Sequence, residues 1–259
     1  MDRLDRLIVF DIVGPMAHFR KYYTNSSSLS YAFPPRTVII GMIAGILGYP
    51  RDSYYERFSS RRCHVGISIV TPVRSIYKTV NYLSVKSRND VNGINGHTQV
   101  PLEILLPEDL SANNLCYRIY FWHSEDEIMD ELERRLNEKR FVYPLYMGLT
   151  EFIAYVSKVF TLNGSDMEIR CSDNYTDIVT VCNLDTIEEG GLSFKTDGSP
   201  MQYIKEIAPL GFSEGRQSVV PAYFVYEKNQ RHLKVRLRGP YLTVNLGGVT
   251  ENITFMEAE

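Results

Sequence analysis

The residues of this chain best suited to chemistry are cations in its first hundred positions. Between Arg20 and Val100 there are 11 lysines and arginines against three acids, a net charge of +8. Guanidinium and ammonium groups bind phosphate oxygens without needing any bond-making geometry. The pattern therefore indicates a surface for an anionic partner, although a solvated basic face would explain the same charges equally well. Beyond Tyr120 the balance reverses to −8, which argues against indiscriminate coating of nucleic acid.

Six cations are candidates for phosphate contacts, and one loop adds aromatic rings to them. Residues 19–30 combine cations, tyrosines and a Ser/Asn run, and unpaired RNA bases stack on such rings. Tyr23 is the expected stacking residue, although a tyrosine between a strand and a helix is just as often a lid on the core. The candidate cations are Arg20, Lys21, Arg36, Lys78, Lys86 and Arg88.

His97 is the histidine considered for acid–base chemistry, because it lies in a basic insertion and imidazole exchanges protons near neutral pH. A metal-independent ribonuclease would also need a base for the 2′-hydroxyl and a cation at the cleaved phosphate. Tyr23, Tyr31 and Lys86 are the residues available for those roles. The alternative, which we favour, is that His97 and the nearby Gln99 contact RNA without catalysis.

Several classes of protein and site are not expected. The sequence contains no GxxxxGK[ST], HExxH, GxSxG or GxGxxG motif, and no two histidines have metal-ligand spacing, so we expect neither a cofactor nor a metal. The apolar stretch 38–49 is much shorter than the ~20 residues of a membrane-spanning helix, so we expect no membrane partner. The four cysteines are widely separated and fit a reducing, cytoplasmic location. They are Cys63, Cys116, Cys171 and Cys182.

The periodicity predicts an α+β chain that begins as a ferredoxin-like domain. The order strand, helix, strand, strand, helix, strand matches a split βαβ unit. The second helix is expected to open at Ser124 with a capping box to Glu127. The segments behind this order are expected at residues 7–13, from Thr37 onward, 65–70, 72–83 as the partner strand of 65–70, 115–122, from Ser124 onward, and 141–147.

An insertion divides this domain, and a different kind of segment follows it. Residues 84–114 contain Asn92-Gly93 and Asn95-Gly96, which are strong turn signals, and predict a protruding β-hairpin. From Tyr155 onward, short β-like runs alternate with turns. We therefore expect a ferredoxin-like domain at 1–150 with a hairpin thumb, and a smaller, mainly-β lobe at 151–259.

Several stretches resemble the CRISPR-associated Cas five family, in a form closest to type I-B systems. The resemblance covers about residues 5–155, and its longest motif is fairly specific. The matching stretches are GPMAHFR at 14–20, SYAFPPRTVIIGMIAGILG at 30–48, HTQVPLE at 97–103 and YMGLTEF at 146–152.

This resemblance implies a repeat-associated RNA-binding subunit of a Cascade surveillance complex in antiviral defence. Such a subunit grips the crRNA 5′ handle, packs its thumb on the backbone subunit, and helps position the large subunit near target DNA. In type I-C systems the family member itself cuts precursor crRNA with a tyrosine, a lysine and a histidine. Here Gly96 stands before His97 in place of the lysine of the catalytic form, so a non-catalytic subunit is expected. A processing endoribonuclease and a protein-interaction scaffold remain as alternatives.

Overall fold

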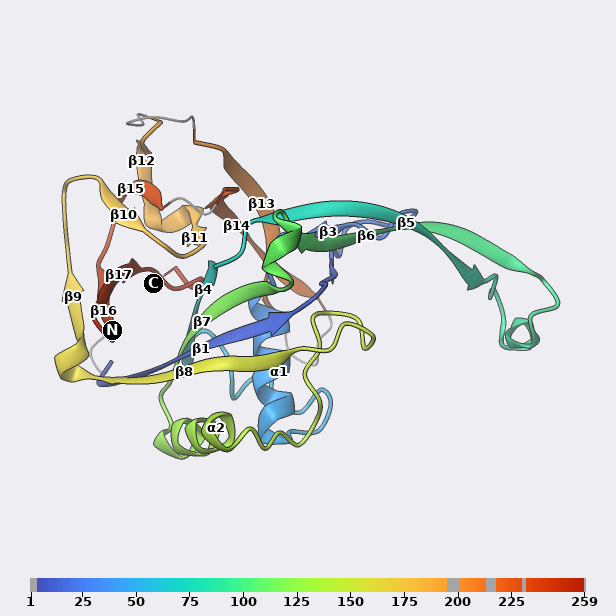
Figure 1. Ribbon diagram of the computed structural model, residues 1–259, viewed down its shortest axis with the longest axis horizontal. Coiled ribbons are helices and arrows are strands. Elements are labelled where there is room, and N and C mark those ends of the chain that lie inside the picture. Colours follow the sequence, from blue (N-terminus) through green and yellow to red (C-terminus); the bar gives the residue numbers. More distant parts are fainter. Residues whose placement is uncertain (1–3, 195–200, 213–217, 230–231, 259) are drawn as a thin grey trace.

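The chain folds into a strand-rich α/β structure with a long projecting hairpin (Figure 1). The computed structural model describes residues 4–194, 201–212, 218–229 and 232–258. Two α-helices are found within these ranges, α1 (Arg36–Leu47) and α2 (Asp126–Glu138). Neither is long and apolar enough to cross a membrane.

A four-stranded antiparallel sheet forms the centre of the molecule. Its strands are β1 (Arg6–Gly14), β4 (Cys63–Ile69), β7 (Leu115–His123) and β8 (Tyr155–Asn163), in the order β4-β7-β1-β8. Every neighbouring pair is antiparallel. Along the chain, α1 lies between β1 and β4, and α2 lies between β7 and β8.

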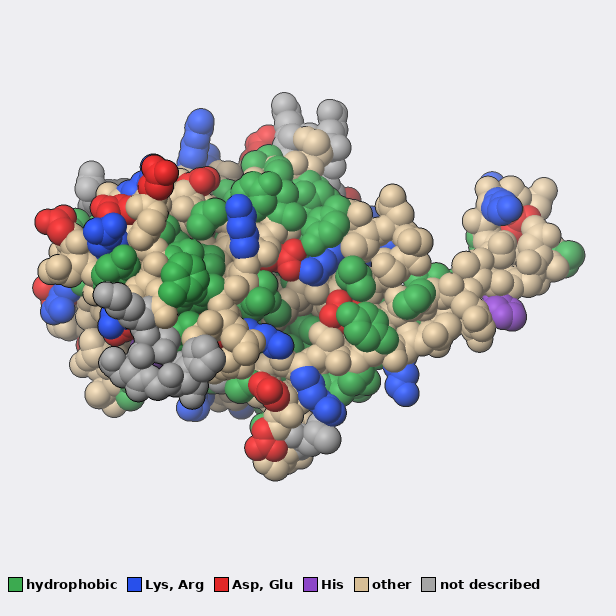
Figure 2. Space-filling view, turned by 90° about the horizontal axis from the view of Figure 1, so that it is seen from above, with side chains coloured by type: hydrophobic (Ala, Val, Ile, Leu, Met, Phe, Trp, Pro, Cys, Tyr) green, Lys and Arg blue, Asp and Glu red, His purple; other side chains and the backbone are tan. Residues whose placement is uncertain are grey.

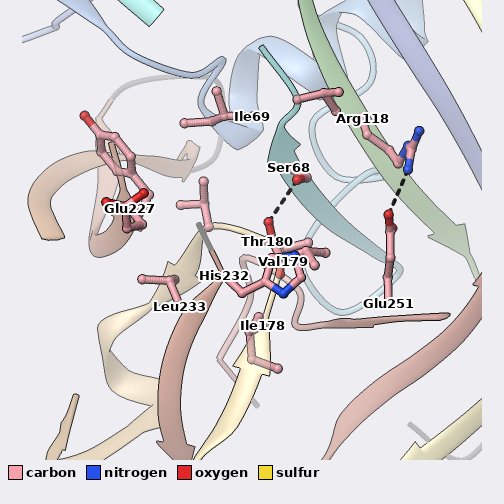
Figure 3. A pocket seen from close by; sticks show the side chains of 13 residues that line it. Ser68, Ile69, Arg118, Ile178, Val179, Thr180, Glu227, His232, Leu233 and Glu251 are labelled. Carbon is pink, nitrogen blue, oxygen red and sulfur yellow. Dashed lines mark hydrogen bonds and ion pairs between the residues drawn. The ribbon is translucent and has the colours of Figure 1, made fainter. Parts of the chain in front are cut away.

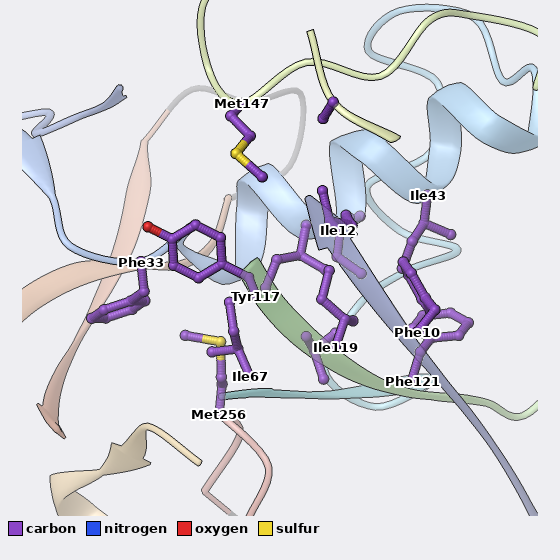
Figure 4. Close-up of a cluster of buried hydrophobic side chains, with 14 of the residues drawn as sticks. Phe10, Ile12, Phe33, Ile43, Ile67, Tyr117, Ile119, Phe121, Met147 and Met256 are labelled. Atoms are coloured by element: carbon purple, nitrogen blue, oxygen red, sulfur yellow. The ribbon is translucent and has the colours of Figure 1, made fainter. Parts of the chain in front are cut away.

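The two faces of this sheet are covered by different parts of the chain. Side chains alternate between the faces of a strand, so successive residues of β1 enter different clusters. Phe10 and Ile12 lie in a buried cluster with Ile43 of α1, which Figure 4 shows together with Phe121 and Ile119. Leu7 and Val9 pack instead with Leu242, Val244 and Ile253 from the end of the chain.

The hairpin consists of β5 (Val73–Leu83) and β6 (His97–Pro107), which pair antiparallel in an unbroken register. A short 3₁₀ helix, η1 (Arg88–Asn92), lies at its tip. The prediction that residues 72–83 pair with 65–70 is therefore wrong. A strand of the central sheet would have buried residues, but none of the eleven residues of β5 is buried. The hairpin arms also begin well before residue 84, where the insertion was expected to start.

Two further predicted elements are corrected. Residues 141–147 form no strand, and the fourth strand of the sheet is β8, so a boundary at 150 would separate β8 from the sheet it completes. The capping box at Ser124 is also absent, because α2 begins at Asp126 and the Glu125 N–H donates to His123 Nδ1 at 3.0 Å.

The remaining strands mostly lie in the second half of the chain. They form three-stranded sheets in the orders β10-β15-β12, β11-β14-β13 and β17-β16-β9, and a small pair, β2-β3. Val181, Ala208 and Phe224 from this half join the same buried cluster as Phe10, so both halves share a core. The bounds are β2 (Phe19–Arg20), β3 (Ser30–Tyr31), η2 (Leu110–Ala112), η3 (Gly164–Asp166), β9 (Met167–Arg170), β10 (Thr176–Ile178), β11 (Cys182–Asn183), η4 (Leu184–Thr186), β12 (Ile187–Leu192), β13 (Tyr203–Phe212), β14 (Val219–Glu227), β15 (Leu233–Leu237), β16 (Tyr241–Leu246) and β17 (Val249–Ile253).

Candidate nucleic-acid interface

Three segments that are distant in sequence meet at the base of the hairpin. The Ala17 N–H donates to Leu105 O at 3.1 Å and the Leu105 N–H donates to Ala17 O at 2.8 Å. The His18 N–H donates to Met147 O at 3.0 Å. The segment after β1, the return arm β6 and the segment before β8 therefore hold one another by backbone hydrogen bonds.

Gly148 is required for this junction. Its φ is +90°, a left-handed conformation that residues with a Cβ rarely adopt. A Cβ at this position would also lie 1.7 Å from His18 O. The glycine therefore allows the segment before β8 to approach the segment after β1 closely.

His18 fastens the loop of residues 20–30 to the hairpin. Its Nδ1 lies 2.7 Å from Glu103 O, and its Nε2 lies 3.0 Å from Ser28 Oγ. Burial lowers the pKa of His18, so the ring is neutral at pH 7, its Nδ1–H donates to the carbonyl and its Nε2 accepts from the hydroxyl. The Ser28 N–H also donates to Pro101 O at 2.9 Å, so a backbone hydrogen bond joins the loop to the hairpin beside this histidine.

Two of the expected RNA contacts in this loop share one carboxylate. Lys21 Nζ lies 2.5 Å from Glu206 Oε2, and the Tyr23 hydroxyl donates to Glu206 Oε1 at 2.7 Å. Burial, together with Glu206, raises the pKa of Tyr23, so this phenol stays protonated at neutral pH. Arg20 remains exposed, with its Nη2 3.5 Å from Thr24 O.

The prediction that Arg36 contacts phosphate is corrected by its burial. The residue is 3% exposed at the start of α1, and its guanidinium forms an ion pair with Glu257. It also donates to Phe58 O at 3.0 Å and to Cys63 O at 3.1 Å. With its donors taken up by the protein interior, Arg36 holds α1 to Glu257 and presents almost no surface to a phosphate.

The expected contacts on the hairpin arms lie on opposite faces. The β5–β6 register pairs Lys78 with Leu102 on one face, and Asn81 with Gln99 and Leu83 with His97 on the other. All three expected residues are exposed. A strand of nucleic acid that follows only one face would therefore meet either Lys78 or the His97–Gln99 pair.

The hairpin tip carries two more of the expected contacts. Lys86 and Arg88 are exposed at the end of the projection, where Figure 2 shows blue side chains and the purple histidine standing clear of the body. Asp90 shapes this turn, because its Oδ2 accepts from the Lys86 N–H at 2.8 Å and from the Ser87 N–H at 2.6 Å. The tip therefore presents cations on an ordered turn.

The residues considered for RNA cleavage are not gathered into one site. Ser28 is bonded to Pro101, whereas His97 lies four residues further toward the tip. At about 3.3 Å per residue, that offset is roughly 13 Å along the strand. Tyr23 and Tyr31 lie close together near the base, with ring centroids 6.5 Å apart. A tyrosine–histidine pair for acid–base cleavage is therefore not assembled in this structure.

A separate cavity of about 160 Å³ lies between the two halves of the chain (Figure 3). Its prominent cation, Arg118, is already paired, with its Nε 2.8 Å from Asp11 Oδ1 and its Nη1 2.9 Å from Glu251 Oε1. This network of ion pairs links the two halves of the chain, and it leaves little of the positive charge of Arg118 available to a ligand. Nor is any group of three or more His, Cys, Asp or Glu placed to hold a metal ion within the residues described.

Two acids beside the expected contacts were missed by sequence reasoning. Glu206 carries no local signal, because its role depends on β13 lying against a loop more than 180 residues earlier. Glu103 lies within the HTQVPLE stretch at 97–103. Its contact with the Ser30 N–H at 2.8 Å, however, depends on how the loop of residues 20–30 folds back onto β6. Tyr77, 62% exposed, lies opposite Glu103 and could have been found from the alternation of β5.

Comparison with solved structures gives a match to the whole fold. The crystal structure of a CRISPR protein from Archaeoglobus fulgidus is similar over 95% of this chain and 98% of its own, with 12% sequence identity and a TM-score of 0.53. This likeness shows a shared fold. A chain of a CRISPR RNA-guided surveillance complex matches over 90% of this chain and 91% of its own, at 12% identity, but its TM-score of 0.48 supports no conclusion.

One curated protein is similar in sequence over a shorter stretch. Redox-sensing transcriptional repressor Rex 1 of Enterococcus faecalis (strain ATCC 700802 / V583) is 31% identical over 130 residues. These residues are 48% of this chain and 58% of the repressor, so the chain spans little more than half of that protein's length. The repressor's activity is therefore not transferred to this chain.

A family model establishes the relationship. The model described as CRISPR-associated protein (Cas_Cas5) matches residues 7–181, which include the central sheet, both helices and the hairpin. These are also the elements that build the hairpin base and carry most of the expected contacts. The chain belongs to the Cas5 family of CRISPR-associated proteins.

Proposed function

We propose that this chain is a non-catalytic subunit of a type I-B-like CRISPR Cascade complex, in which it binds the 5′ handle of the crRNA. The observation that carries the proposal is the exposed basic hairpin of a Cas5 family member, with a basic, tyrosine-bearing loop fastened to its base. Cations and exposed rings suit unpaired RNA, which is bound through phosphates and stacked bases. The proposed contacts are Arg20, Lys21, Tyr23, Lys78, Lys86, Arg88, His97 and Gln99.

We further propose that the first part of the chain is a ferredoxin-like domain that ends after β8. The sheet order β4-β7-β1-β8 and the single helix after β1 and after β7 support this arrangement. The mainly-β lobe would then begin near residue 164. Among the described residues from there onward, the regular elements are strands and short 3₁₀ helices.

Protein partners are proposed from the apolar residues on the hairpin. Exposed apolar side chains on a projecting element favour contact with another protein. We assign this contact to the backbone subunit of the complex, with the large subunit and target DNA nearby. The most exposed of these side chains are Tyr77, Tyr82, Leu83, Val85, Val91 and Ile94, with Ile94 82% exposed.

The test is incubation of the purified full chain with labelled cognate repeat RNA in EDTA, with a scrambled RNA as control. Retention and cleavage are followed on the same gels. We expect the cognate RNA to be retained intact and the scrambled RNA to be retained at least about tenfold more weakly.

Two outcomes would contradict this proposal. Discrete metal-independent cleavage that disappears in His97→Ala would make the chain a processing endoribonuclease. Equal retention of both RNAs, or none, would favour a protein-interaction scaffold whose basic face contacts acidic protein surfaces.

A further inference from the structure

A cavity of about 260 Å³ lies at the base of the hairpin, where the hairpin meets β13 and β14. It lies beside the loop of residues 20–30 rather than along the exposed hairpin arms, and it contains two acids that sequence reasoning did not assign to RNA. Four charged side chains line it: Lys21, Glu103, Glu206 and Lys228.

The charges of this cavity cancel. Two ammonium groups and two carboxylates leave no formal net charge, so a bare phosphate would meet two carboxylates and a partner's arginine would meet two lysines. A neutral ligand that presents donors and acceptors on one edge matches such a mixed lining. An RNA base is a ligand of this kind.

The walls suit a flat ring. Ile69, Val73, Leu105 and Ile204 contribute apolar surface between the charged groups. Ligand sites commonly combine apolar walls with a few placed polar groups, and those for drug-sized molecules measure about 300–1,000 Å³. At about 260 Å³, this cavity is the size for one ring system rather than a whole nucleotide.

Tyr226 supplies a further polar group. The residue is 9% exposed, lines the cavity, and makes no hydrogen bond through its hydroxyl to any residue that the structure describes. Burial and the charges of Glu206 and Glu103 raise the pKa of Tyr226, so its hydroxyl remains a donor. Both carboxylates line the same cavity as this side chain.

Glu103 retains capacity to accept hydrogen bonds from a ligand. Its Oε2 accepts from the Ser30 N–H at 2.8 Å, and its Oε1 has only a long contact of 3.4 Å with the Tyr77 hydroxyl. An ionised carboxylate offers about four acceptor positions. Glu206 is more fully engaged, because Lys21 and Tyr23 each bond to one of its oxygens.

We infer that this cavity binds one unpaired nucleobase with an exocyclic amino group, and that Glu103 accepts the amino hydrogen. Cytosine, adenine and guanine each present such a group, whereas uracil has no exocyclic amino group and carries the O4 carbonyl where cytosine carries its amino group. The inference rests on the proposed RNA-binding function, and it adds Glu103 as a residue that determines base preference.

The test replaces each unpaired position of the cognate RNA by uridine and measures the affinity of the full chain. At one position we expect the affinity to fall at least about tenfold, which is in the lower part of the range for losing a base-specific pair of hydrogen bonds. The analogue without the amino group at that position, such as inosine for guanosine, should reproduce the loss. Glu103→Gln, which keeps the side chain's size, should remove this preference.

Two further variants make the test specific. Glu108→Gln alters an exposed acid just beyond β6, outside the cavity, and should leave the preference unchanged. Tyr226→Phe removes only a hydroxyl and should weaken the preference at the same position at least about threefold, so the test does not depend on Glu103→Gln folding.

The outcomes separate this inference from the function on which it rests. If the unaltered chain fails to retain cognate RNA, both the proposed function and the cavity inference are contradicted. If it retains that RNA but no position depends on an amino group, or if both cavity variants keep the full preference, the cavity inference alone is overturned.

Discussion

At the scale of single residues, arginines from the same basic part of the chain serve different purposes. Arg20 is exposed in the loop, whereas Arg36, only sixteen positions later, is buried against Glu257. Composition cannot separate the two, because burial depends on which distant segments cover the side chain. Removing one partner of such a buried ion pair strongly destabilises the fold, because the other partner is left as an unpaired buried charge.

Arg36→Ala is accordingly expected to lower the free energy of unfolding by about 3–5 kcal/mol, because it leaves the Glu257 carboxylate buried without its partner. RNA affinity, measured below the unfolding transition, should not change. The matched variant Arg20→Ala should behave in the opposite way, with a change in stability within about 0.5 kcal/mol and weaker RNA binding. Urea unfolding and RNA titration measure both quantities, and weaker RNA binding by a stable Arg36→Ala protein would show that this arginine does reach RNA.

At the scale of elements, the hairpin is an extended arm fixed at one end. None of the residues of β5 is buried, so packing contributes little to its outer part, and its order depends on the β5–β6 ladder and the closed turn at Asp90. At the base, hydrogen bonds to Ala17 and Ser28 fix its direction. The tip cations can therefore be changed with little effect on the fold.

The double variant Lys86→Gln/Arg88→Gln is expected to bind cognate RNA more weakly, with little change in stability. Each cation that neutralises one phosphate of a single strand contributes about 0.7 to the slope of log affinity against log salt concentration, so the slope should fall by about 1.4. Affinity measured across a salt series provides this value. Arg140→Gln, just beyond α2 and with its side chain 78% exposed, is the control that should leave the slope unchanged, and an unchanged slope in the double variant would remove the tip from the RNA surface.

The sequence predicts local elements well and pairings poorly. Apolar residues recurring every three to four positions located α1 and α2, and the Asn-Gly pairs located the tip of the hairpin, because these signals lie within a few residues. The pairing predicted for residues 72–83 is wrong, since the apolar content of a strand does not specify which strand it pairs with. Glu206 and Tyr226 reach the hairpin base only through the folding of β13 and β14, and no local pattern encodes that contact.

At the scale of the whole molecule, the two halves of the chain are parts of one packed structure. One face of the central sheet is covered by the helices and the other by strands β16 and β17. The Arg118 network crosses between the halves through Asp11 and Glu251. A lobe that supplies one wall of a sheet cannot unfold without exposing that sheet to water.

Unfolding is therefore expected to be a single transition for both halves. Trp122, the only tryptophan, lies on β7 and reports on the central sheet, whereas hydrogen exchange of β13 and β14 reports on the second half. In a urea series the two probes should share one midpoint. Leu242→Ala, at a 1% exposed position on β16, should lower the free energy of unfolding by about 2–5 kcal/mol and move both probes together. Separate midpoints, or a variant that shifts only the hydrogen-exchange probe, would instead show a lobe that folds independently of the sheet it covers.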